Sequence, residues 1–314
     1  MELFLREESK MKKNDLISIK DLSPQTIRTL LENATQFKKN KKKGTAELKG
    51  KSIGLLFQKP SNRTRVSFEV ALWQMGGHCI YLSPEEIDLG KRESTSDVAQ
   101  TLSRYLDCIV ARTNRHQDVV DLAKFSSIPV INGLSDLTHP CQGLADLLSI
   151  QENFKTFKGI TVAYIGDGNN VCHSLMLGCA KVGLNIHIAS PKNYEPLPEM
   201  VALAQKISKE SGAKILLTSS PQEAVKGAHV IYADVWVSMG QEKESEERLK
   251  DFQGFQINKD LVKLADKNYL FMHCLPAHRD LEVTSDIIDG PRSIVFDQAE
   301  NRLHVHKAVL EFLL

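Results

Sequence analysis

The sequence lacks several features that would each point to a particular class of protein. No stretch approaches the roughly 18 consecutive apolar residues of a membrane-spanning helix, so none is expected. Lys and Arg total 40 against 39 Asp and Glu, and this balance gives the chain no overall attraction for nucleic acid or an anionic membrane. The 314 residues are 42% hydrophobic and 25% charged, which is typical of a globular protein of about two domains.

Paired cysteines are also absent. None of the six cysteines forms a C-x-x-C pair, which favours buried free thiols in a reducing compartment. The first ten residues carry three glutamates and lack the basic start and long apolar run of a secretory signal, and a transit peptide would be poor in acids. We therefore expect a cytoplasmic protein.

Short apolar runs alternate with helix-like segments along the chain. A first helix is predicted over residues 24–39, with Ser23 as its N-cap. The apolar runs lack polar alternation, which favours parallel strands buried on both faces. These runs are residues 52–57, 79–82, 108–111, 129–132, 160–165, 185–189, 214–218, 229–233, 269–272 and 293–296. Ten strands are too many for one small sheet, so we predict two α/β halves with doubly wound parallel sheets, joined within residues 151–159.

Ligands of open parallel sheets bind beyond the carboxyl ends of the strands, and the first candidate motif lies there. The motif follows the first strand and precedes a predicted helix, and it consists of Lys59, Pro60, Ser61, Asn62, Arg63, Thr64 and Arg65. Hydroxyl groups, the free amides of a first helical turn and two arginines make a site for an anion such as phosphate. The alternative is an ordinary helix cap with exposed arginines.

Two further motifs follow other strands of the first half. Arg112 ends the strand that begins at Cys108, where a surface ion pair is the alternative interpretation. His139 and Gln142 are three residues apart at the start of a predicted helix, so both can face one cleft. A histidine there can offer a hydrogen bond or a positive charge to a carbonyl oxygen, although a lone histidine is more often structural.

The glycine-rich turn after the strand at 160–165 resembles a dinucleotide-binding fingerprint but departs from it. Val171 occupies the third glycine position, and no acidic residue ends the next strand. Nicotinamide binding is therefore disfavoured. The asparagines of this turn, Asn169 and Asn170, remain candidates for holding the carboxylate of a zwitterion.

Acidic, hydroxyl and thiol side chains follow two late strands of the second half. Asp234 and Ser238 come after one strand, and His273 and Cys274 come at the end of another. A cysteine protease pair is disfavoured because neighbours along a strand point to opposite faces. A zinc site of Cys274, His139 and Asp234 is also disfavoured, because no pair shows the spacing of metal ligands.

Taken together, these motifs resemble those of the carbamoyltransferases, and within that family the ornithine branch. The resemblance covers the chain from about residue 16 and rests on four motifs in fixed order, at residues 61–65, 139–142, 234–240 and 273–277. The branch is indicated by two of them. Aspartate enzymes usually carry His-Pro-Leu-Pro-Arg where this chain has His-Cys-Leu-Pro-Ala, and putrescine enzymes lack the Ser-Met-Gly turn at 238–240.

The resemblance implies a role for each matching position. The phosphate of carbamoyl phosphate would be held by Ser61, Asn62, Arg63 and Thr64. The carbamoyl end would be held by Arg112, His139, Gln142 and Arg302, with Cys274 and the carbonyl of Leu275 at the reacting centre. The amino-acid part of ornithine would be held by Asn170, Asp234, Ser238 and Met239. The catalytic residues would be Cys274, Arg112, His139 and Asp234, with no cofactor and no metal.

The resemblance also implies an organisation. It predicts a carbamoyl-phosphate-binding domain over residues 1–152, an ornithine-binding domain over 153–296 and a C-terminal helix over 297–314 that packs back on the first domain. The implied assembly is a homotrimer in which a neighbour's loop completes each site. This chain departs from the family at Asn62, often Thr, and at Asp88, where many relatives place Gln; if that loop reaches over, Lys91 or Arg92 would be its contact.

Overall fold

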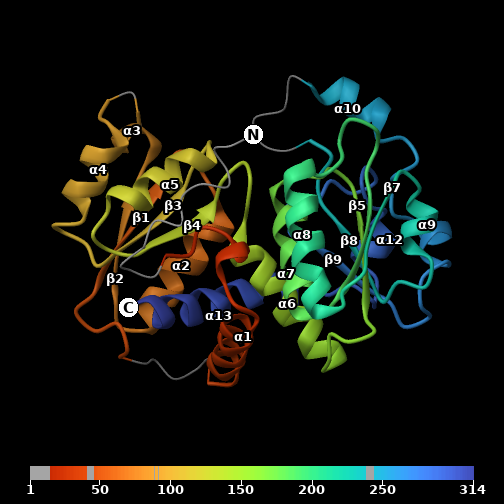
Figure 1. Cartoon of the computed structure of the whole chain (residues 1–314), viewed down its shortest axis with the longest axis horizontal. Helices are drawn as coiled ribbons and strands as arrows, with labels where there is room; N and C mark the ends of the chain where they lie inside the picture. Colours follow the sequence, from red (N-terminus) through yellow and green to blue (C-terminus); the bar gives the residue numbers. More distant parts are fainter. Residues whose placement is uncertain (1–14, 41–45, 88, 91, 238–243) are drawn as a thin grey trace.

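The computed structural model describes residues 15–40, 46–87, 89–90, 92–237 and 244–314. They form two lobes side by side, each built on one parallel sheet (Figure 1). Among these residues no helix has the length and apolar character to cross a membrane.

The first sheet has the strand order β2-β1-β3-β4, with every pair parallel. Its strands are β1 (Ser52–Phe57), β2 (His78–Leu82), β3 (Cys108–Arg112) and β4 (Val130–Leu134). The helices of this half are η1 (Ile19–Asp21), α1 (Pro24–Lys39), α2 (Asn62–Gln74), α3 (Pro84–Ile87), α4 (Thr95–Leu102), α5 (His116–Phe125) and α6 (Pro140–Phe154).

The second sheet has the order β7-β6-β5-β8-β9 and is also parallel throughout. Its strands are β5 (Thr161–Ile165), β6 (Asn185–Ala189), β7 (Ile215–Thr218), β8 (Val230–Ala233) and β9 (Leu270–His273). Its helices are α7 (Asn170–Val182), α8 (Pro198–Ser211), α9 (Pro221–Val225), α10 (Ser245–Asp251), α11 (Lys259–Val262), α12 (Ser285–Ile288) and α13 (Val295–Leu313). The prediction of two doubly wound parallel sheets is confirmed.

One predicted strand is wrong. Residues 293–296 do not form a strand; Ser293 makes an isolated bridge to Phe271, and Ile294 donates one backbone hydrogen bond to the Phe271 carbonyl. The chain then enters α13 at Val295, with Asp297 in the first turn, where the helix dipole favours a carboxylate. The apolar run that suggested a strand is therefore the short approach to a helix.

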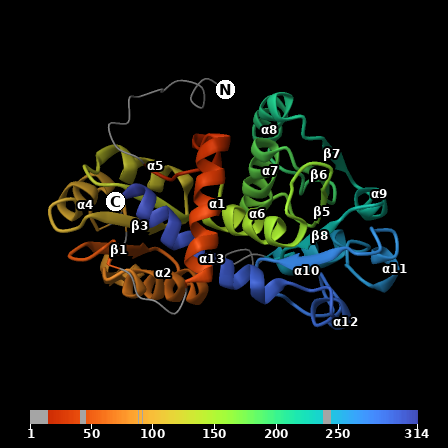
Figure 2. The same cartoon turned by 90° about the horizontal axis from the view of Figure 1, so that it is seen from below.

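Helix α13 joins the two halves. It leaves the second sheet beside β9 and packs on α1, α2 and α6, so the C-terminal helix returns to the first half (Figure 2). One buried apolar cluster accordingly runs from β1 through α6 to β5 and β6 of the second sheet. The predicted domain limits at 152/153 and 296/297 fall within α6 and α13, so they stay predictions about folding units.

The order of strands fixes where a ligand can enter. In the first sheet, β2 lies on one side of β1, and β3 and β4 lie on the other, so the order of strand addition reverses between β1 and β3. In the second sheet, it reverses between β5 and β8. Connections leave in opposite directions at such a point, which opens a crevice beyond the carboxyl ends of the two strands. The phosphate-type motif follows β1, Arg112 ends β3, the asparagine turn follows β5, and Asp234 follows β8.

The turn after β5 leaves no room for a side chain at Gly168. A Cβ atom there would lie 2.1 Å from the Pro196 backbone nitrogen and 2.4 Å from the Glu195 carbonyl carbon. We expect Gly168→Ala to lower the free energy of unfolding by about 3 kcal/mol, because backbone cannot turn aside as a side chain can. Chemical denaturation would measure the loss.

Gly178→Ala in α7 is the matched control. The nearest atom to its added Cβ is the Leu147 Cδ1 methyl at 3.1 Å, which can rotate away. We expect this variant to lower the free energy of unfolding by less than about a third of the Gly168→Ala loss, because alanine has a higher helix propensity than glycine. Equal losses in the two variants would contradict the backbone clash.

Candidate active site

The motif after β1 forms the start of α2. Ser61 is the N-cap, and its Oγ accepts the Thr64 amide at 3.3 Å, which leaves the hydroxyl proton free to donate elsewhere. Asn62 is exposed in the first turn, which contains no acidic residue. This helix start therefore offers N–H and O–H donors to an anion, as the sequence indicated.

The two arginines of this motif diverge. Burial lowers the pKa of Arg63, and the nearby Cys274 sulfur and Asp234 carboxylate oppose that shift, so Arg63 faces the second half of the protein. Arg65 turns outward: its Nε donates to Glu69 at 2.8 Å, and its guanidinium lies 3.7 Å over the Tyr81 ring. Only Arg63 contributes to the crevice, which corrects the expectation of two arginines.

Arg302 reaches this region from α13. Its Nη1 donates to Gln142 Oε1 at 2.8 Å and its Nη2 to Thr64 Oγ1 at 3.0 Å. These bonds join the last helix to α6 and α2, so Gln142, Thr64 and Arg302 meet as the resemblance implied. Arg302 is 4% exposed, and both of these partners are neutral acceptors.

Arg112 and His139 complete a cluster of basic groups. Burial, together with the charges of Arg302 and Arg63, lowers the pKa of Arg112 to about 10, so its guanidinium remains charged at neutral pH. Burial and the same cations lower the pKa of His139 well below its ordinary value, so its ring is neutral and can donate one N–H. Three arginines and a neutral imidazole thus converge from β3, α2, α13 and the start of α6.

Several donors in this cluster are unsatisfied. Within the described ranges, Arg112 Nε, Arg302 Nε and His139 Nδ1 are buried and have no hydrogen-bond partner. An unpaired buried polar group costs about 1–3 kcal/mol, so two arginine donors and an imidazole nitrogen near one another are unusual unless a ligand pairs with them. Their convergence with Arg63 indicates an oxyanion as that ligand.

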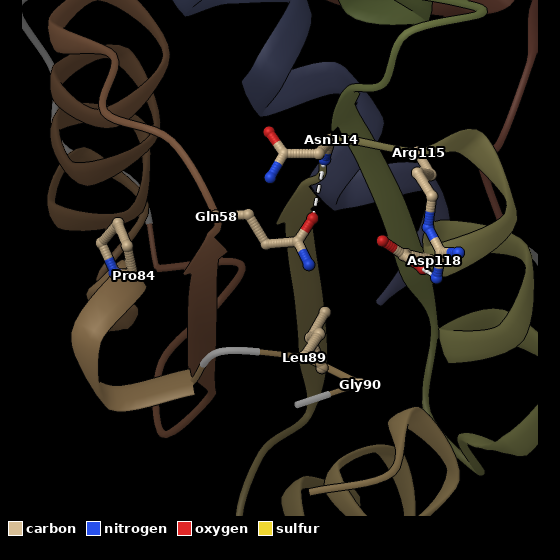
Figure 3. A pocket seen from close by; sticks show the side chains of 7 residues that line it. All are labelled: Gln58, Pro84, Leu89, Gly90, Asn114, Arg115 and Asp118. Atoms are coloured by element: carbon tan, nitrogen blue, oxygen red, sulfur yellow. Dashed lines mark hydrogen bonds and ion pairs between the residues drawn. The ribbon is translucent and has the colours of Figure 1, made fainter. Parts of the chain in front are cut away.

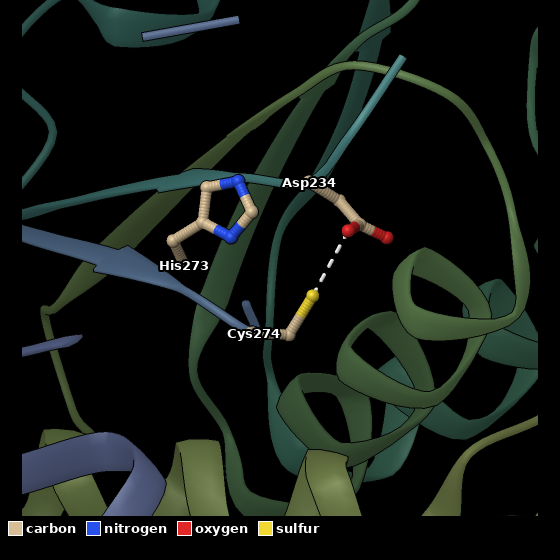
Figure 4. A group of neighbouring side chains, drawn as sticks. All are labelled: Asp234, His273 and Cys274. Carbon is tan, nitrogen blue, oxygen red and sulfur yellow. Dashed lines mark hydrogen bonds between the residues drawn. The ribbon is translucent and has the colours of Figure 1, made fainter. Parts of the chain in front are cut away.

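Asp234 and Cys274 form the opposite part of the site (Figure 4). The Cys274 thiol donates to Asp234 Oδ1 at 2.9 Å. The other carboxylate oxygen accepts Asn169 Nδ2 at 2.7 Å, and Oδ1 also accepts the Val235 amide at 2.8 Å. Burial and the charge of Asp234 raise the pKa of Cys274 well above its ordinary value, so the sulfur is a neutral thiol.

His273 shapes the backbone next to Cys274. Its Nδ1 accepts the Leu275 amide at 2.9 Å, so the ring proton lies on Nε2, which faces Glu282 Oε1 at 3.3 Å. Leu275 has a φ of 58°, a left-handed conformation that a branched residue adopts only when its surroundings hold it there. The hydrogen bond from its amide is one such restraint.

Asp234, His273 and Cys274 also form the kind of cluster that a metal ion requires. One ligand atom from each lies within 4.8 Å of the others. The zinc set weighed from the sequence had His139 in place of His273. In the present arrangement the thiol donates to Asp234 and both nitrogens of His273 are engaged, so a metal ion would first have to break these bonds.

The remaining predicted site residues differ in placement. Asn170 opens α7, and its Nδ2 donates to the Ser135 carbonyl, which bridges the two halves. Ser238 and Met239 lie outside the described residues, as do Asp88 and Lys91.

The structure gives two further residues, Asn169 and Lys59, a place in the site that the sequence did not assign to them. Asn169 was a general candidate from its turn; it caps α7 and binds Asp234 directly. Lys59 was part of the motif after β1 but was given no role; burial and the neighbouring charge of Arg112 lower its pKa. Its position after a central strand was the signal that could have identified it.

A cavity of about 440 Å³ lies beyond the carboxyl ends of β1 and β3 (Figure 3). Gln58 after β1 and Asn114 after β3 line it, and Gln58 Oε1 accepts a hydrogen bond from the Asn114 backbone N–H at 2.7 Å. Its cation, Arg115, is already paired with Asp118. Among its lining residues that the structure describes, none is an unpaired cation of the kind found in the cluster around Arg112.

Comparison with known proteins places the chain in a family. Residues 14–152 match the carbamoyl-phosphate-binding domain of the aspartate/ornithine carbamoyltransferases, and residues 158–313 match their aspartate/ornithine-binding domain. The chain belongs to the aspartate/ornithine carbamoyltransferase family.

Particular relatives narrow the comparison to one branch. Ornithine carbamoyltransferase from Pyrococcus horikoshii is 54% identical over 306 residues, covering 97% of this chain and 96% of that protein. A solved ornithine carbamoyltransferase from Pyrococcus furiosus has a TM-score of 0.92 at 53% identity, covering 95% and 96% of the two chains. An anabolic ornithine carbamoyltransferase from Campylobacter jejuni has a TM-score of 0.90 at 38% identity, covering 96% and 98%.

The hydrogen bond between Cys274 and Asp234 yields a prediction about thiol reactivity. Because the carboxylate raises the pKa of the thiol, Asp234→Asn should lower that pKa and increase the thiolate fraction. We expect alkylation of Cys274 by iodoacetamide at about pH 8.5 to become several-fold faster. Peptide mass spectrometry would follow each cysteine, with Cys79, outside the site, as internal control. An unchanged or slower rate at Cys274 would refute the electrostatic role of Asp234.

Proposed function

We propose that this protein transfers the carbamoyl group of carbamoyl phosphate to the δ-amine of L-ornithine, giving L-citrulline and phosphate. The single observation that carries the proposal is the convergence of Arg63, Arg112 and Arg302 opposite the Asp234–Cys274 pair. One half suits a phosphoryl anion, and the other suits an amino acid. Relatives of over 50% identity that bear the name ornithine carbamoyltransferase support the choice of substrates.

The phosphate half activates the leaving group. Ser61, Asn62, Arg63 and Thr64 would hold the phosphate oxygens through the start of α2. Arg112, neutral His139 and the Gln142–Arg302 pair would face the carbamoyl end. Donors aimed at the carbonyl oxygen and at the departing phosphate stabilise the negative charge that develops in the transition state.

The amine must attack as a neutral group. An alkyl amine of pKa about 10.4 costs roughly 4.6 kcal/mol to deprotonate at pH 7. A carboxylate at the reacting nitrogen would increase that cost, so we assign Asp234 to the α-ammonium, together with Asn170, Ser238 and Met239. The amine lone pair adds to the carbonyl carbon, the bond from carbon to the phosphate oxygen breaks, and the proton lost by the amine passes to the departing phosphate, which leaves as monohydrogen phosphate.

Cys274 orients the reacting groups without forming a covalent intermediate. Its pKa is raised well above the ordinary value, so it is a poor nucleophile, and an acyl phosphate needs no further activation. The thiol and the Leu275 carbonyl would lie beside the attacking nitrogen.

We further propose an assembly, a location and a division of the chain. By resemblance to the family, the chain would form a cytoplasmic homotrimer that uses no cofactor or metal and contributes to arginine biosynthesis. The carbamoyl-phosphate domain would comprise residues 1–152 and the ornithine domain residues 153–296. Sedimentation equilibrium would test the trimer, and a monomeric mass for the active enzyme would contradict it.

A substrate panel tests the proposed reaction. Purified protein and carbamoyl phosphate would be incubated with ornithine, putrescine, aspartate or N-acetylornithine, and the carbamoylated product measured by colour formation. We expect kcat/KM for ornithine to exceed the others by at least about 100-fold, because a site built for an α-amino acid leaves polar groups unpaired with other amines. A preference for putrescine would overturn the amino-acid half of the proposal and leave the phosphate half standing.

The divergent arginines offer a matched pair of variants. Arg63→Ala should lower kcat/KM by about 100-fold or more through lost charge-assisted contacts with phosphate. Arg65→Ala removes the same kind of side chain from an outward-facing position and should stay within about threefold of the unchanged enzyme. Similar losses in both variants would contradict the assignment of Arg63 to the phosphate.

The pH profile tests the state of the nucleophile. We expect kcat/KM to rise from about pH 6 to 8 or above as the amine loses its proton. His139 does not produce this rise, because its pKa lies well below the ordinary value and the ring is already neutral over that range. A flat profile of initial rates would argue against attack by the free amine.

A further inference from the structure

A buried carboxylate lies beneath the site and takes no part in the proposed chemistry. Asp146 is on α6, one turn after Gln142, and is completely buried. Its Oδ1 accepts Gln142 Nε2 at 2.8 Å and Gln298 Nε2 at 2.7 Å. Its Oδ2 accepts the Tyr232 hydroxyl at 3.1 Å.

The two glutamine amides can be oriented in only one way. Arg302 is a donor, so the amide atom that it meets is Gln142 Oε1. The His273 backbone N–H is also a donor, so the atom that it meets, at 2.9 Å, is Gln298 Oε1. Both amides must therefore direct their Nε2 donors at Asp146, and an acceptor is required there.

These bonds connect the two parts of the site. On the phosphate side, Gln142 holds Arg302, whose other nitrogen donates to Thr64. On the amino-acid side, Tyr232 lies in β8 two residues before Asp234. Gln298 binds the backbone of His273, the residue before Cys274. Asp146 accepts hydrogen bonds from both chains of contacts, through Gln142 on one side and through Tyr232 and Gln298 on the other.

We infer that Asp146 is a positioning residue that couples the binding of the two substrates: its Oδ1 holds Gln142 on Arg302 and Gln298 on β9 at the same time. The inference rests on the proposed function, which assigns the two parts of the site to carbamoyl phosphate and ornithine. Without an acceptor at this place, the Gln142 amide can rotate and present its Nε2 to Arg302. Two donors then face each other, and the link to the phosphate loop is lost.

Two substitutions separate the acceptor from the rest of the side chain. Asp146→Ala removes it. Asp146→Asn keeps it at the Oδ1 position, because the Asn oxygen can accept from both glutamine amides. Its nitrogen then faces the Tyr232 hydroxyl, whose proton loses its acceptor, so this variant changes the Tyr232 contact and keeps the contacts with the two glutamines. The readout is the Kd of norvaline, an ornithine analogue without the δ-amine, measured by titration calorimetry with and without saturating carbamoyl phosphate. The ratio of the two Kd values is the coupling factor.

We expect a coupling factor of about tenfold or more in the unchanged protein, retained within about threefold in Asp146→Asn and close to one in Asp146→Ala. A coupling factor in Asp146→Ala equal to that of the unchanged protein would overturn the inference. So would equal losses in the two variants, because charge rather than the acceptor would then be responsible. If the unchanged protein bound neither compound, the proposed function itself would fail, which is a separate result.

Ser149→Ala is the matched structural control. Its Oγ accepts Asn301 Nδ2 at 2.9 Å, so the variant breaks a buried bond between the same helices, α6 and α13, without touching Asp146. This variant should lower Tm and leave the coupling factor unchanged. If the coupling factor fell here as well, loss of packing between the helices would explain the effect, and the inference would be overturned.

Tyr232→Phe serves where Asp146→Ala does not fold. It removes the bond to Oδ2 and also the acceptor that the Tyr232 hydroxyl offers to Gln298 Nε2 at 3.1 Å, and the coupling factor should fall by about two- to fivefold. An unchanged factor in this variant would count against the inference.

Discussion

The constraint on which this structure depends is the burial of several cations around a space where negative charge belongs. Arg302 is 4% exposed and Arg112 is 8% exposed, and each lowers the pKa of a neighbouring basic group. Partly desolvated guanidinium groups repel one another and cost free energy, which an anion between them would offset. Arg302 is supplied by the last helix. Because this arginine has to reach Gln142 and Thr64, α13 must leave the second sheet and pack across the first half.

The sequence predicted those parts of the site that depend on position along a strand. Doubly wound sheets bring the carboxyl ends of β1 and β3 to one edge, so Arg63 and Arg112 could be placed without knowing any side-chain direction. Arg65 shows the limit of this reasoning. It lies two residues from Arg63 in the same motif, yet a glutamate four residues later on α2 and the Tyr81 ring draw it away.

The parts that the sequence missed are set by packing between distant segments. Asp146 occupies a helix that is buried on nearly every side, and only its contacts with Tyr232 and Gln298, from two other elements, reveal its surroundings. Arg302 was placed by resemblance, since position within α13 does not indicate a site. The predicted strand at 293–296 failed for a similar reason: the segment does bond to Phe271, but only for two residues before the helix begins.

The charge balance of the site decides which nitrogen of ornithine can react. Arg63, Arg112 and Arg302 contribute three positive charges, against two negative charges on the carbamoyl phosphate dianion, and His139 adds none because its pKa is lowered. Lys59 beside Arg112 adds a positive charge that the Asp234 carboxylate balances, so a net positive charge of one remains in the site. At about 5 Å and an effective dielectric constant near 20, a further positive charge is disfavoured by about 3 kcal/mol. That is most of the roughly 4.6 kcal/mol needed to deprotonate an alkyl amine at pH 7.

Asp234, already stabilised by Asn169 and the Cys274 thiol, lies to one side and attracts an ammonium group there. In the proposed reaction, the cations assigned to the phosphate would therefore favour a neutral δ-amine at the carbonyl carbon and a charged α-amine beside Asp234.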